Sequence, residues 1–469
     1  MMEEISLSET ESICPECFAV VPARRVGRGD RIFLRKTCPE HGSHEAVIWR
    51  GRPAFSSWVR PKTPSCPENP STIVEKGCPL DCGLCAEHRQ HTCTALIEVT
   101  QSCNLRCAFC FADAGNKNAA DPAMADLKEQ FDWLLLVAGP CNVQLSGGEP
   151  TLRDDLPEIV ALGRSRGFSF IQINTNGLRL AKDPSYVKAL KDAGVASVFL
   201  QFDSVEDSVY RKLRGRELLR EKRLAIEHCA GHGIGVVLVP TIVPGVNTDQ
   251  IGPIIEFAFQ ELPAIRGVHF QPVSYFGRYP GPPGDEDRIT IPEIIMEIET
   301  QTGARIRAEH FKPPGCENAL CSFHGNFVLL NDGTLRPWTQ LQPKDCCCKP
   351  VFAAEGAAKA RRFVTRFWSR PEEMQAPSIC SQGQSLGGWD EFLNRAGTHS
   401  LCISGMAFQD AWNLDLDRLK DCCIHVVHPD GRLIPFCAYN ITDSEGRSYY
   451  RDNGSGLSRR GKGSAGEAA

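Results

Sequence analysis

The stretch that decides the fold is Thr100-Gln101-Ser102-Cys103-Asn104-Leu105-Arg106-Cys107-Ala108-Phe109-Cys110-Phe111. Its three thiols have the spacing C-x3-C-x2-C. Four thiolates would complete the coordination of a [4Fe-4S] cluster, whereas three leave one iron free to bind a small molecule. A structural zinc site has no need of such a vacancy. The spacing therefore predicts a reactive metal centre.

A short apolar run, Ala95-Leu96-Ile97-Glu98-Val99-Thr100, precedes the cysteines and predicts a β-strand. The thiols then lie on the loop after its carboxyl end, where parallel α/β folds place their active sites. With Phe109 directly before the third cysteine, the loop resembles the signature of the radical S-adenosylmethionine (SAM) superfamily. The resemblance implies that Cys103, Cys107 and Cys110 hold a cluster that chelates and reductively cleaves SAM. The 5′-deoxyadenosyl radical then abstracts hydrogen from an unactivated C–H position.

Beyond this loop, strand-like and helix-like segments alternate as far as Val273. We expect strands at 96–100, 142–145, 169–174, 197–202, 235–241 and 267–271, and helices at 124–138, 156–166, 187–193 and 216–231. Such alternation predicts an α/β fold with a parallel sheet and right-handed crossovers. The resemblance implies a partial (β/α)6 barrel.

Polar residues follow the expected strands, at the edge where a cofactor would bind. The pair Gly147-Gly148 lets backbone approach a ligand closely. By its place after the next strand, this segment resembles the superfamily's contact with the methionine amino group of SAM. The later loops carry side chains suited to ribose hydroxyls or substrate. The candidate cofactor-binding residues are Gly147, Gly148, Glu149, Pro150, Asn174, Asn176, Gln201 and Asp203.

The N-terminus carries two cysteine knuckles around a short β-like segment, as in a zinc ribbon or a rubredoxin-like iron site. Three ligands are evident, Cys14, Cys17 and Cys38, and the fourth is His41 or Cys66. The metal is a single Fe or Zn. A structural role and electron transfer both stay open.

A second C-x3-C-x2-C loop consists of Cys78, Cys82 and Cys85. With Cys93 as fourth ligand it predicts an auxiliary [4Fe-4S] cluster. The alternative is a second SAM-binding cluster, although Leu84 replaces the aromatic before the last cysteine. His88 and His91 are expected at the surface or behind the ligands.

The C-terminal third contains two expected hairpins flanked by cysteines, which predict another auxiliary cluster over the open side of the barrel. Its expected ligands are Cys316, Cys321, one of Cys422 and Cys423, and Cys437, with Cys402 as a competitor. Cys346, Cys347 and Cys348 stay unassigned.

These segments predict five units along the chain. They are an N-terminal rubredoxin- or zinc-ribbon-like module at 1–66, an auxiliary-cluster segment at 67–94, a radical SAM barrel at 95–279, a C-terminal iron–sulfur domain at 285–445 and a disordered tail at 446–469. The linker between barrel and C-terminal domain is rich in proline and glycine.

The composition and net charge indicate which classes of partner and which cellular compartment we expect for this protein. A net charge of -5 gives no basic field for nucleic acid. No apolar run reaches the roughly 18 residues that span a bilayer, and no signal sequence precedes the first knuckle. The 23 cysteines suggest metal binding in a reducing cytoplasm.

Across residues 12–445 the chain resembles the radical SAM branch that contains the archaeal dihydropterin methylase and the tetraether lipid synthase. This implies C–C bond formation, by methylation of a small pterin-like substrate or by coupling of lipid alkyl chains, with a reductant such as flavodoxin or ferredoxin. The remaining alternatives are an iron–sulfur electron carrier and an interaction protein that is stabilised by structural zinc.

Overall fold

The computed structural model describes residues 4–67, 70, 72–115, 120–339, 350–369 and 388–451. Cys346, Cys347 and Cys348 lie outside this part, as does the expected tail beyond residue 451. Residues 446–451, which we expected in the tail, are described, and Tyr450 is buried.

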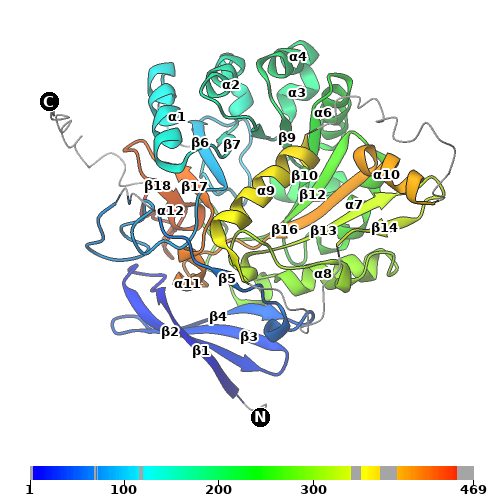
Figure 1. Ribbon diagram of the computed structural model, residues 1–469. Helices are drawn as coiled ribbons and strands as arrows, with labels where there is room; N and C mark the ends of the chain where they lie inside the picture. The colour runs from blue at the N-terminus through cyan, green and yellow to red at the C-terminus, as the bar shows by residue number, and fades with distance from the viewer. Residues whose placement is uncertain are drawn as a thin grey trace.

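The N-terminus forms a four-stranded antiparallel sheet in chain order, drawn in blue in Figure 1 on the side away from most of the helices. Its strands are β1 (Glu4–Ile13), β2 (Val20–Arg28), β3 (Arg31–Cys38) and β4 (Gly42–Arg50). Buried hydrogen bonds attach it to the rest of the protein: Lys36 Nζ donates to the carbonyl of Ala411 at 2.7 Å, and Arg25 pairs with Asp415 at 2.7 Å. The sheet is therefore fixed to the C-terminal segment.

Six parallel strands form the centre of the main sheet, and they neighbour one another in chain order. They are β6 (Thr94–Thr100), β7 (Asn142–Gly147), β8 (Ile171–Thr175), β9 (Ser197–Gln201), β10 (Gly235–Val239) and β12 (Ile265–Pro272). The connecting helices include α1 (Met124–Ala138), α2 (Leu156–Ser165), α4 (Pro184–Ala193), α6 (Leu219–Gly231) and α7 (Ile251–Gln260). This arrangement confirms the predicted α/β fold.

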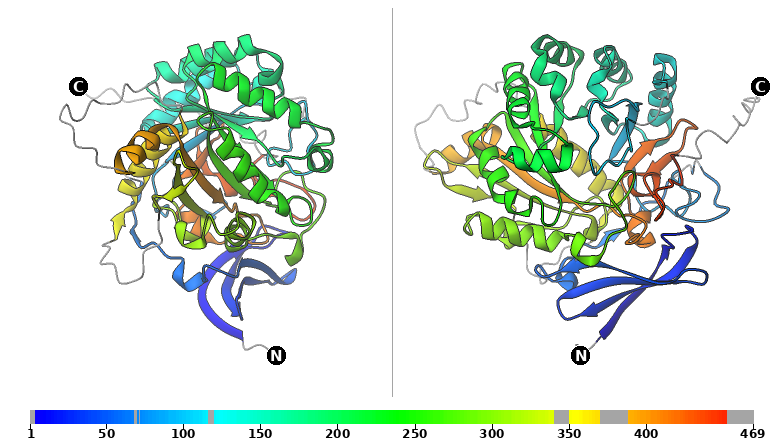
Figure 2. Two further views of the ribbon diagram at one scale, coloured as in Figure 1. Left: turned by 90° about the vertical axis from the view of Figure 1, so that its right-hand side faces the viewer. Right: turned by 180° about the vertical axis from the view of Figure 1, so that it is seen from behind.

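Strands from the C-terminal segment extend the same sheet at both edges. At one edge β16 (Ser400–Met406) pairs parallel with β12, followed by β13 (Ser322–Leu329) and β14 (Leu335–Pro337). At the other edge β17 (Ile424–Val427) pairs parallel with β6, followed by β18 (Leu433–Pro435). The segment beyond the barrel therefore completes the barrel sheet, and helix α9 (Ala353–Trp368) crosses in front of it (Figures 1 and 2).

The remaining elements are short or peripheral. They are β5 (Lys62–Thr63), β11 (Thr241–Ile242), β15 (Val351–Phe352), α3 (Leu178–Lys182), α5 (Asp207–Arg214), α8 (Ile291–Gln301), α10 (Gly388–Thr398), α11 (Leu416–Lys420) and α12 (Phe436–Tyr439).

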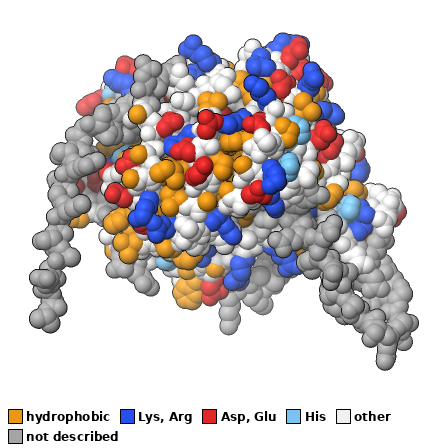
Figure 3. Space-filling model, turned by 90° about the horizontal axis from the view of Figure 1, so that it is seen from above, with side chains coloured by type: hydrophobic (Ala, Val, Ile, Leu, Met, Phe, Trp, Pro, Cys, Tyr) orange, Lys and Arg blue, Asp and Glu red, His pale blue; other side chains and the backbone are white. Residues whose placement is uncertain are grey.

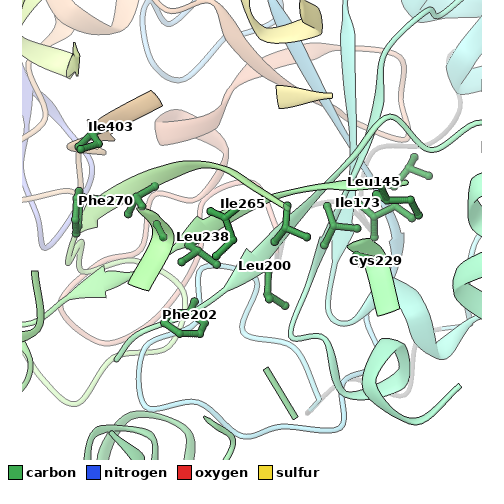
Figure 4. Close-up of a cluster of buried hydrophobic side chains, with 14 of the residues drawn as sticks. Leu145, Ile173, Leu200, Phe202, Cys229, Leu238, Ile265, Phe270 and Ile403 are labelled. Carbon is green, nitrogen blue, oxygen red and sulfur yellow. The ribbon is translucent and has the colours of Figure 1, made fainter. Parts of the chain in front are cut away.

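The main core lies between the strands and the helices packed on them. Outward-facing side chains of successive strands form a continuous row, labelled from Leu145 and Ile173 to Phe270 and Ile403 in Figure 4. Burial of this apolar area drives the folding of the sheet against its helices. The opposite face of the same strands is left free to line a cavity.

The surface carries charges of both signs. On the face seen in Figure 3, Lys and Arg side chains are interspersed with Asp and Glu. Among the described residues, no helix is both long and apolar enough to cross a membrane.

Candidate active site and metal centres

The cysteine loop leaves the carboxyl end of β6 and is held in place by Arg278. The backbones of Cys110 and Arg278 exchange two hydrogen bonds of 2.9 Å, and Arg278 Nε donates to the carbonyl of Cys107 at 3.0 Å. Cys103, Cys107 and Cys110 all line one cavity. Burial raises the pKa of the Cys103 thiol to about 11, so a bound metal is needed to keep it as a thiolate at neutral pH.

The two glycines at the end of β7 are required by their contact with this loop. Gly148 N donates to the carbonyl of Thr100, and Glu149 N donates to that of Ser102, both at 2.8 Å. A Cβ on Gly148 would overlap the carbonyl oxygen of Ser102. Gly147 has a φ of +115°, which side-chain-bearing residues rarely adopt. The Gly-Gly segment therefore docks directly on the cysteine loop.

Glu149 ties the next strand end to this pair of loops. Its buried carboxylate accepts hydrogen bonds from Thr175 Oγ1 and the Asn176 backbone N–H, both at 2.6 Å. Asn176 Nδ2 in turn donates to Asn104 Oδ1 at 2.7 Å. Three consecutive strand ends thus form one hydrogen-bonded rim around the cysteine loop.

The predicted cofactor-binding residues divide into two groups. Those that line the cavity beside the cysteines are Gly147, Gly148, Glu149, Asn174, Asn176 and Gln201. Pro150 and Asp203 are not among the described lining residues. Asp203 is completely buried, and its carboxylate is occupied by Arg214 and by the backbone N–H of Thr241. Burial opposes the charge of Arg214, but Asp203 and the sulfur of Cys107 hold its pKa above the ordinary range.

The cavity has a volume of about 710 Å³ and passes through the interior of the curved sheet. At the carboxyl ends of the strands it is bounded by the cysteine loop, and at the amino ends by Cys93, Cys316 and Cys423. One side of the cavity is formed by α9, through side chains that include Phe363 and Trp368. The site is therefore a passage with thiols at both ends.

The thiols of Cys93, Cys316 and Cys423, here called the thiol trio, lie within 4.8 Å of one another and are buried. We expected Cys93 to join Cys78, Cys82 and Cys85 instead. The strand pairing explains the difference: Cys93 leads into β6, Cys423 leads into β17, and Cys93 N donates to the Cys423 carbonyl at 2.8 Å. Hydrogen bonds from Cys316 and then Cys423 lower the pKa of Cys93 well below its ordinary value, a direction that favours metal binding by the trio.

The second cysteine loop contributes no thiol to the described trio. A hydrogen bond to Cys78 and then burial raise the pKa of Cys82, with further contributions from the charges of Cys85 and Cys422. Cys422 is thus a nearby thiol from another segment. Two more predicted ligands, Cys321 and Cys437, do not belong to the described trio: Cys321 Sγ lies 3.6 Å from Arg418 Nη2, and Cys437 Sγ accepts from Gln409 N.

The N-terminal sheet brings Cys14, Cys17, Cys38 and His41 together, with all four ligand atoms within 4.8 Å of one another. Cys66 is exposed and is not part of this described set. Although burial alone would raise it, hydrogen bonds led by that from His41 lower the pKa of Cys38 to about 6. Three thiols and one imidazole fit a tetrahedral zinc or iron site.

The polar side chains in the middle of the cavity, among them Gln144, Gln172 and His269, were not predicted from the sequence. The signal was present in the alternation of Gln172 and Asn174 with Ile171 and Ile173. A buried parallel strand normally reads as a continuous apolar run. Polar residues at every second position therefore indicated that one face of this strand lines a cavity.

Comparison with known proteins gives two matching family models. The model of the radical SAM superfamily matches residues 97–258, and that of the HMPTM N-terminal zinc ribbon domain matches residues 6–50. The first match covers the barrel from strand β6 to helix α7, and the second covers the N-terminal sheet.

The chain is 35% identical to the 7,8-dihydro-6-hydroxymethylpterin dimethyltransferase of Methanocaldococcus jannaschii, over 92% of this chain and 93% of that protein. It is 33% identical to a probable GTP 3′,8-cyclase of Methanothermobacter marburgensis, over 37% of this chain and 56% of the other. A solved structure of Streptococcus suis SuiB bound to its precursor peptide SuiA has a TM-score of 0.38 and 18% identity, covering 46% of this chain and 48% of that one.

The donor set fits the cofactors of such a protein, because three thiols on one loop face a cavity beside a glycine pair that admits close approach. The additional cysteine sets fit auxiliary metal sites. Enzymes of this kind bind a [4Fe-4S] cluster and SAM, cleave SAM reductively, and require a reductant and a substrate. The similarity extends over nearly the full length of both chains, and the chain therefore belongs to the radical SAM superfamily.

Proposed function

We propose that this protein methylates a small pterin-like heterocycle, or forms another C–C bond on it. The observation that carries the proposal is the cavity, whose lining beside the cysteine loop includes Asn, Gln, Ser and His side chains among its aromatic and aliphatic ones. A lipid alkyl chain offers no hydrogen bonds to such a lining, and buried polar groups without partners are costly. The relative named as a pterin dimethyltransferase supports the same substrate class.

In this proposal Cys103, Cys107 and Cys110 hold the cluster that binds SAM. Gly147, Gly148 and Glu149 form the segment against which SAM rests, with Pro150 directly behind it in the chain, and Asn174, Asn176 and Gln201 contact SAM or substrate from the neighbouring strand ends. Asp203 acts indirectly, by orienting Arg214 beside Cys107. When bound, the cluster and SAM supply a carbon radical. The protein orients the substrate and excludes water from it.

We assign the other metal sites as follows. The thiol trio holds an auxiliary cluster at the amino ends of the strands, and Cys78, Cys82 and Cys85 hold a second one, with Cys422 close enough to affect the pKa of Cys82. Cys14, Cys17, Cys38 and His41 hold a zinc ion that stabilises the N-terminal sheet, which the match to a zinc ribbon domain supports. Cys321 and Cys437 have no ligand role in this assignment.

The proposal extends to organisation and partners. Residues 1–66 form a separate metal-binding module, whereas the segment 285–445 completes the barrel. The electron donor is a small reductant such as flavodoxin or ferredoxin. Because the thiols must stay reduced, we propose the cytoplasm as the compartment.

The test is anaerobic reconstitution with iron and sulfide, followed by dithionite, SAM and 7,8-dihydro-6-hydroxymethylpterin. We expect 5′-deoxyadenosine and an altered pterin from the wild type and neither from a variant with Cys103→Ala, Cys107→Ala and Cys110→Ala. Pterin recovered unaltered, with nucleoside formation that the pterin does not stimulate, would contradict the substrate class. No nucleoside from a protein with full iron content would contradict the assignment of the cysteine loop.

A further inference from the structure

Two neighbouring strands send carboxamide side chains into the cavity. On β7 these are Asn142 and Gln144, and on β8 they are Gln172 and Asn174. We call these four residues the amide wall. The residues between them, such as Val143 and Ile173, point outward into the apolar core. The strands are therefore polar on the cavity side along their whole length.

Three of the four amide groups are hydrogen-bonded to one another or to serine hydroxyls. Gln144 Nε2 donates to Gln172 Oε1 at 2.7 Å, and Gln172 Nε2 donates to Ser197 Oγ at 3.2 Å. Asn174 Nδ2 donates to Ser146 Oγ at 3.3 Å. This network holds the carboxamides in fixed orientations, so the wall is organised before any ligand binds.

Two buried atoms of the wall have no partner among the described residues: Asn142 Nδ2, a donor, and Asn174 Oδ1, an acceptor. Asn142 is only 4% exposed. They stand four residue steps apart along the sheet, about 13 Å at ~3.3 Å per residue. Buried polar atoms in folded proteins are nearly always hydrogen-bonded. These two atoms therefore indicate a ligand that lies along the wall and can both accept and donate.

An aromatic surface adjoins the wall. Phe199, which pairs in register with Asn174, stacks on Trp368 with ring centroids 5.5 Å apart and planes at 27°. His269 lies 5.4 Å from Phe199 and is hydrogen-bonded to Ser404 Oγ at 2.9 Å. All of these residues line the cavity. A flat ring resting on this surface would present its edge toward the amides.

We infer that the amide wall is the specificity-determining surface for a flat heterocyclic substrate whose edge carries both N–H donors and C=O or ring-nitrogen acceptors. Carboxamides suit this task because each one donates and accepts. The aromatic surface of Phe199, Trp368 and His269 supports the ring. The inference rests on the proposed function and deepens it, because it names the residues that select the heterocycle.

The test measures ligand binding by cluster-loaded wild type and by the variants Asn142→Leu and Gln144→Met. The matched control is Gln260→Met, at the exposed end of helix α7 and outside the described cavity lining. Dissociation constants are measured for 7,8-dihydro-6-hydroxymethylpterin by fluorescence and for SAM by equilibrium dialysis. We expect each wall variant to weaken pterin binding at least tenfold, while SAM binding stays within twofold and the control matches wild type. Equal iron content and circular dichroism show that the variants fold.

Unchanged pterin binding in both wall variants would overturn the inference and leave the proposed function standing. If wild type fails to bind the pterin, the same variants are tested with guanine and GTP, which carry a similar donor–acceptor edge. Binding of either probe that the wall variants lose would support the wall as a reader of heterocycles while contradicting the pterin assignment. Binding of none of the three probes by wild type would overturn both proposals.

Discussion

Arg214 donates from Nε and Nη2 to the two carboxylate oxygens of Asp203, both at 2.7 Å, and neither side chain is more than 3% exposed. The sulfur of Cys107 lies close enough to contribute to the raised pKa of Arg214. The pair thus keeps a positive charge beside the cysteine loop without leaving that charge uncompensated in the interior.

Replacing Asp203 by Asn should leave the buried positive charge of Arg214 without its counter-ion. Breaking a buried pair in this way costs about 3–5 kcal/mol. We expect anaerobic urea denaturation to show a loss of this size, together with lower iron content in the cysteine loop. Arg211 and Glu217 form an exposed pair, at 56% and 65% exposure, for which Glu217→Gln should cost less than about 1 kcal/mol. Equal losses in the two variants would contradict the structural role of the buried pair.

Substitution of Gly148 by Ala should separate the Gly-Gly segment from the cysteine loop, because the added Cβ meets the Ser102 carbonyl oxygen, a backbone atom that cannot turn away. We predict at least a tenfold loss of SAM affinity in equilibrium dialysis. Gly231→Ala is the control, since no atom outside its own helix lies within 4 Å of the added methyl group. Normal SAM binding by Gly148→Ala would mean that this loop contact does not hold the cofactor.

The geometry of the N-terminal site predicts that His41, and not Cys66, is its fourth metal ligand. His41→Ala should remove one equivalent of zinc or iron per chain, measured by plasma mass spectrometry, because His41 lies with Cys14, Cys17 and Cys38. Cys66→Ala should keep the full metal content, since Cys66 lies outside the described set. The reverse pattern would identify Cys66 as the fourth ligand.

The membership of Cys93 in the thiol trio can be tested by combining substitutions. Cys93→Ala and Cys316→Ala should each remove the same iron, so the double variant should lose no more than either single variant. Cys93→Ala combined with Cys78→Ala should lose iron from two sites, and the losses should add. Additive loss in the first pair and not in the second would return Cys93 to the second cysteine loop.

Because the imidazole of His269 is enclosed by the protein, we predict that the protein loses stability as the pH falls. Burial lowers its pKa from 6.5 to about 4, so between these values the unfolded chain binds a proton that the folded chain does not. Stability from this group is therefore lost as the pH falls below about 6.5, by about 1 kcal/mol at pH 5.5. His269→Gln should gain that amount relative to wild type on going from pH 7.5 to 5.5 in anaerobic urea denaturation. A difference between His269→Gln and wild type that does not change with pH would contradict the prediction.

The parallel strands were predictable because each combines an apolar run with a turn or helix signal. Helix α1 begins and ends at the predicted residues, Met124 and Ala138. Strand β12 begins two residues before the predicted one, at Ile265. The edge strands β16 and β17 were not predicted as parts of this sheet, because their partners lie far away in the sequence and the pairing depends on tertiary contacts.

The cysteine loop could be identified from local spacing, since its three thiols lie within eight residues. The thiol trio could not, because its members come from segments more than 100 residues apart. Spacing in sequence favoured Cys93 as a neighbour of Cys85, whereas the pairing of β6 with β17 brings it to Cys423. Long-range ligand sets of this kind become visible once the sheet order is known.

Strand β6 joins the two ends of the cavity: Cys93 stands immediately before it and Cys103 three residues after it. Its seven residues act as a spacer of about 23 Å, at ~3.3 Å per residue. In the proposed function the chemistry is consequently arranged along a line, with the cysteine loop at one end, the substrate beside the middle and the thiol trio at the other end. Anything exchanged between the two metal sites must then travel past the substrate.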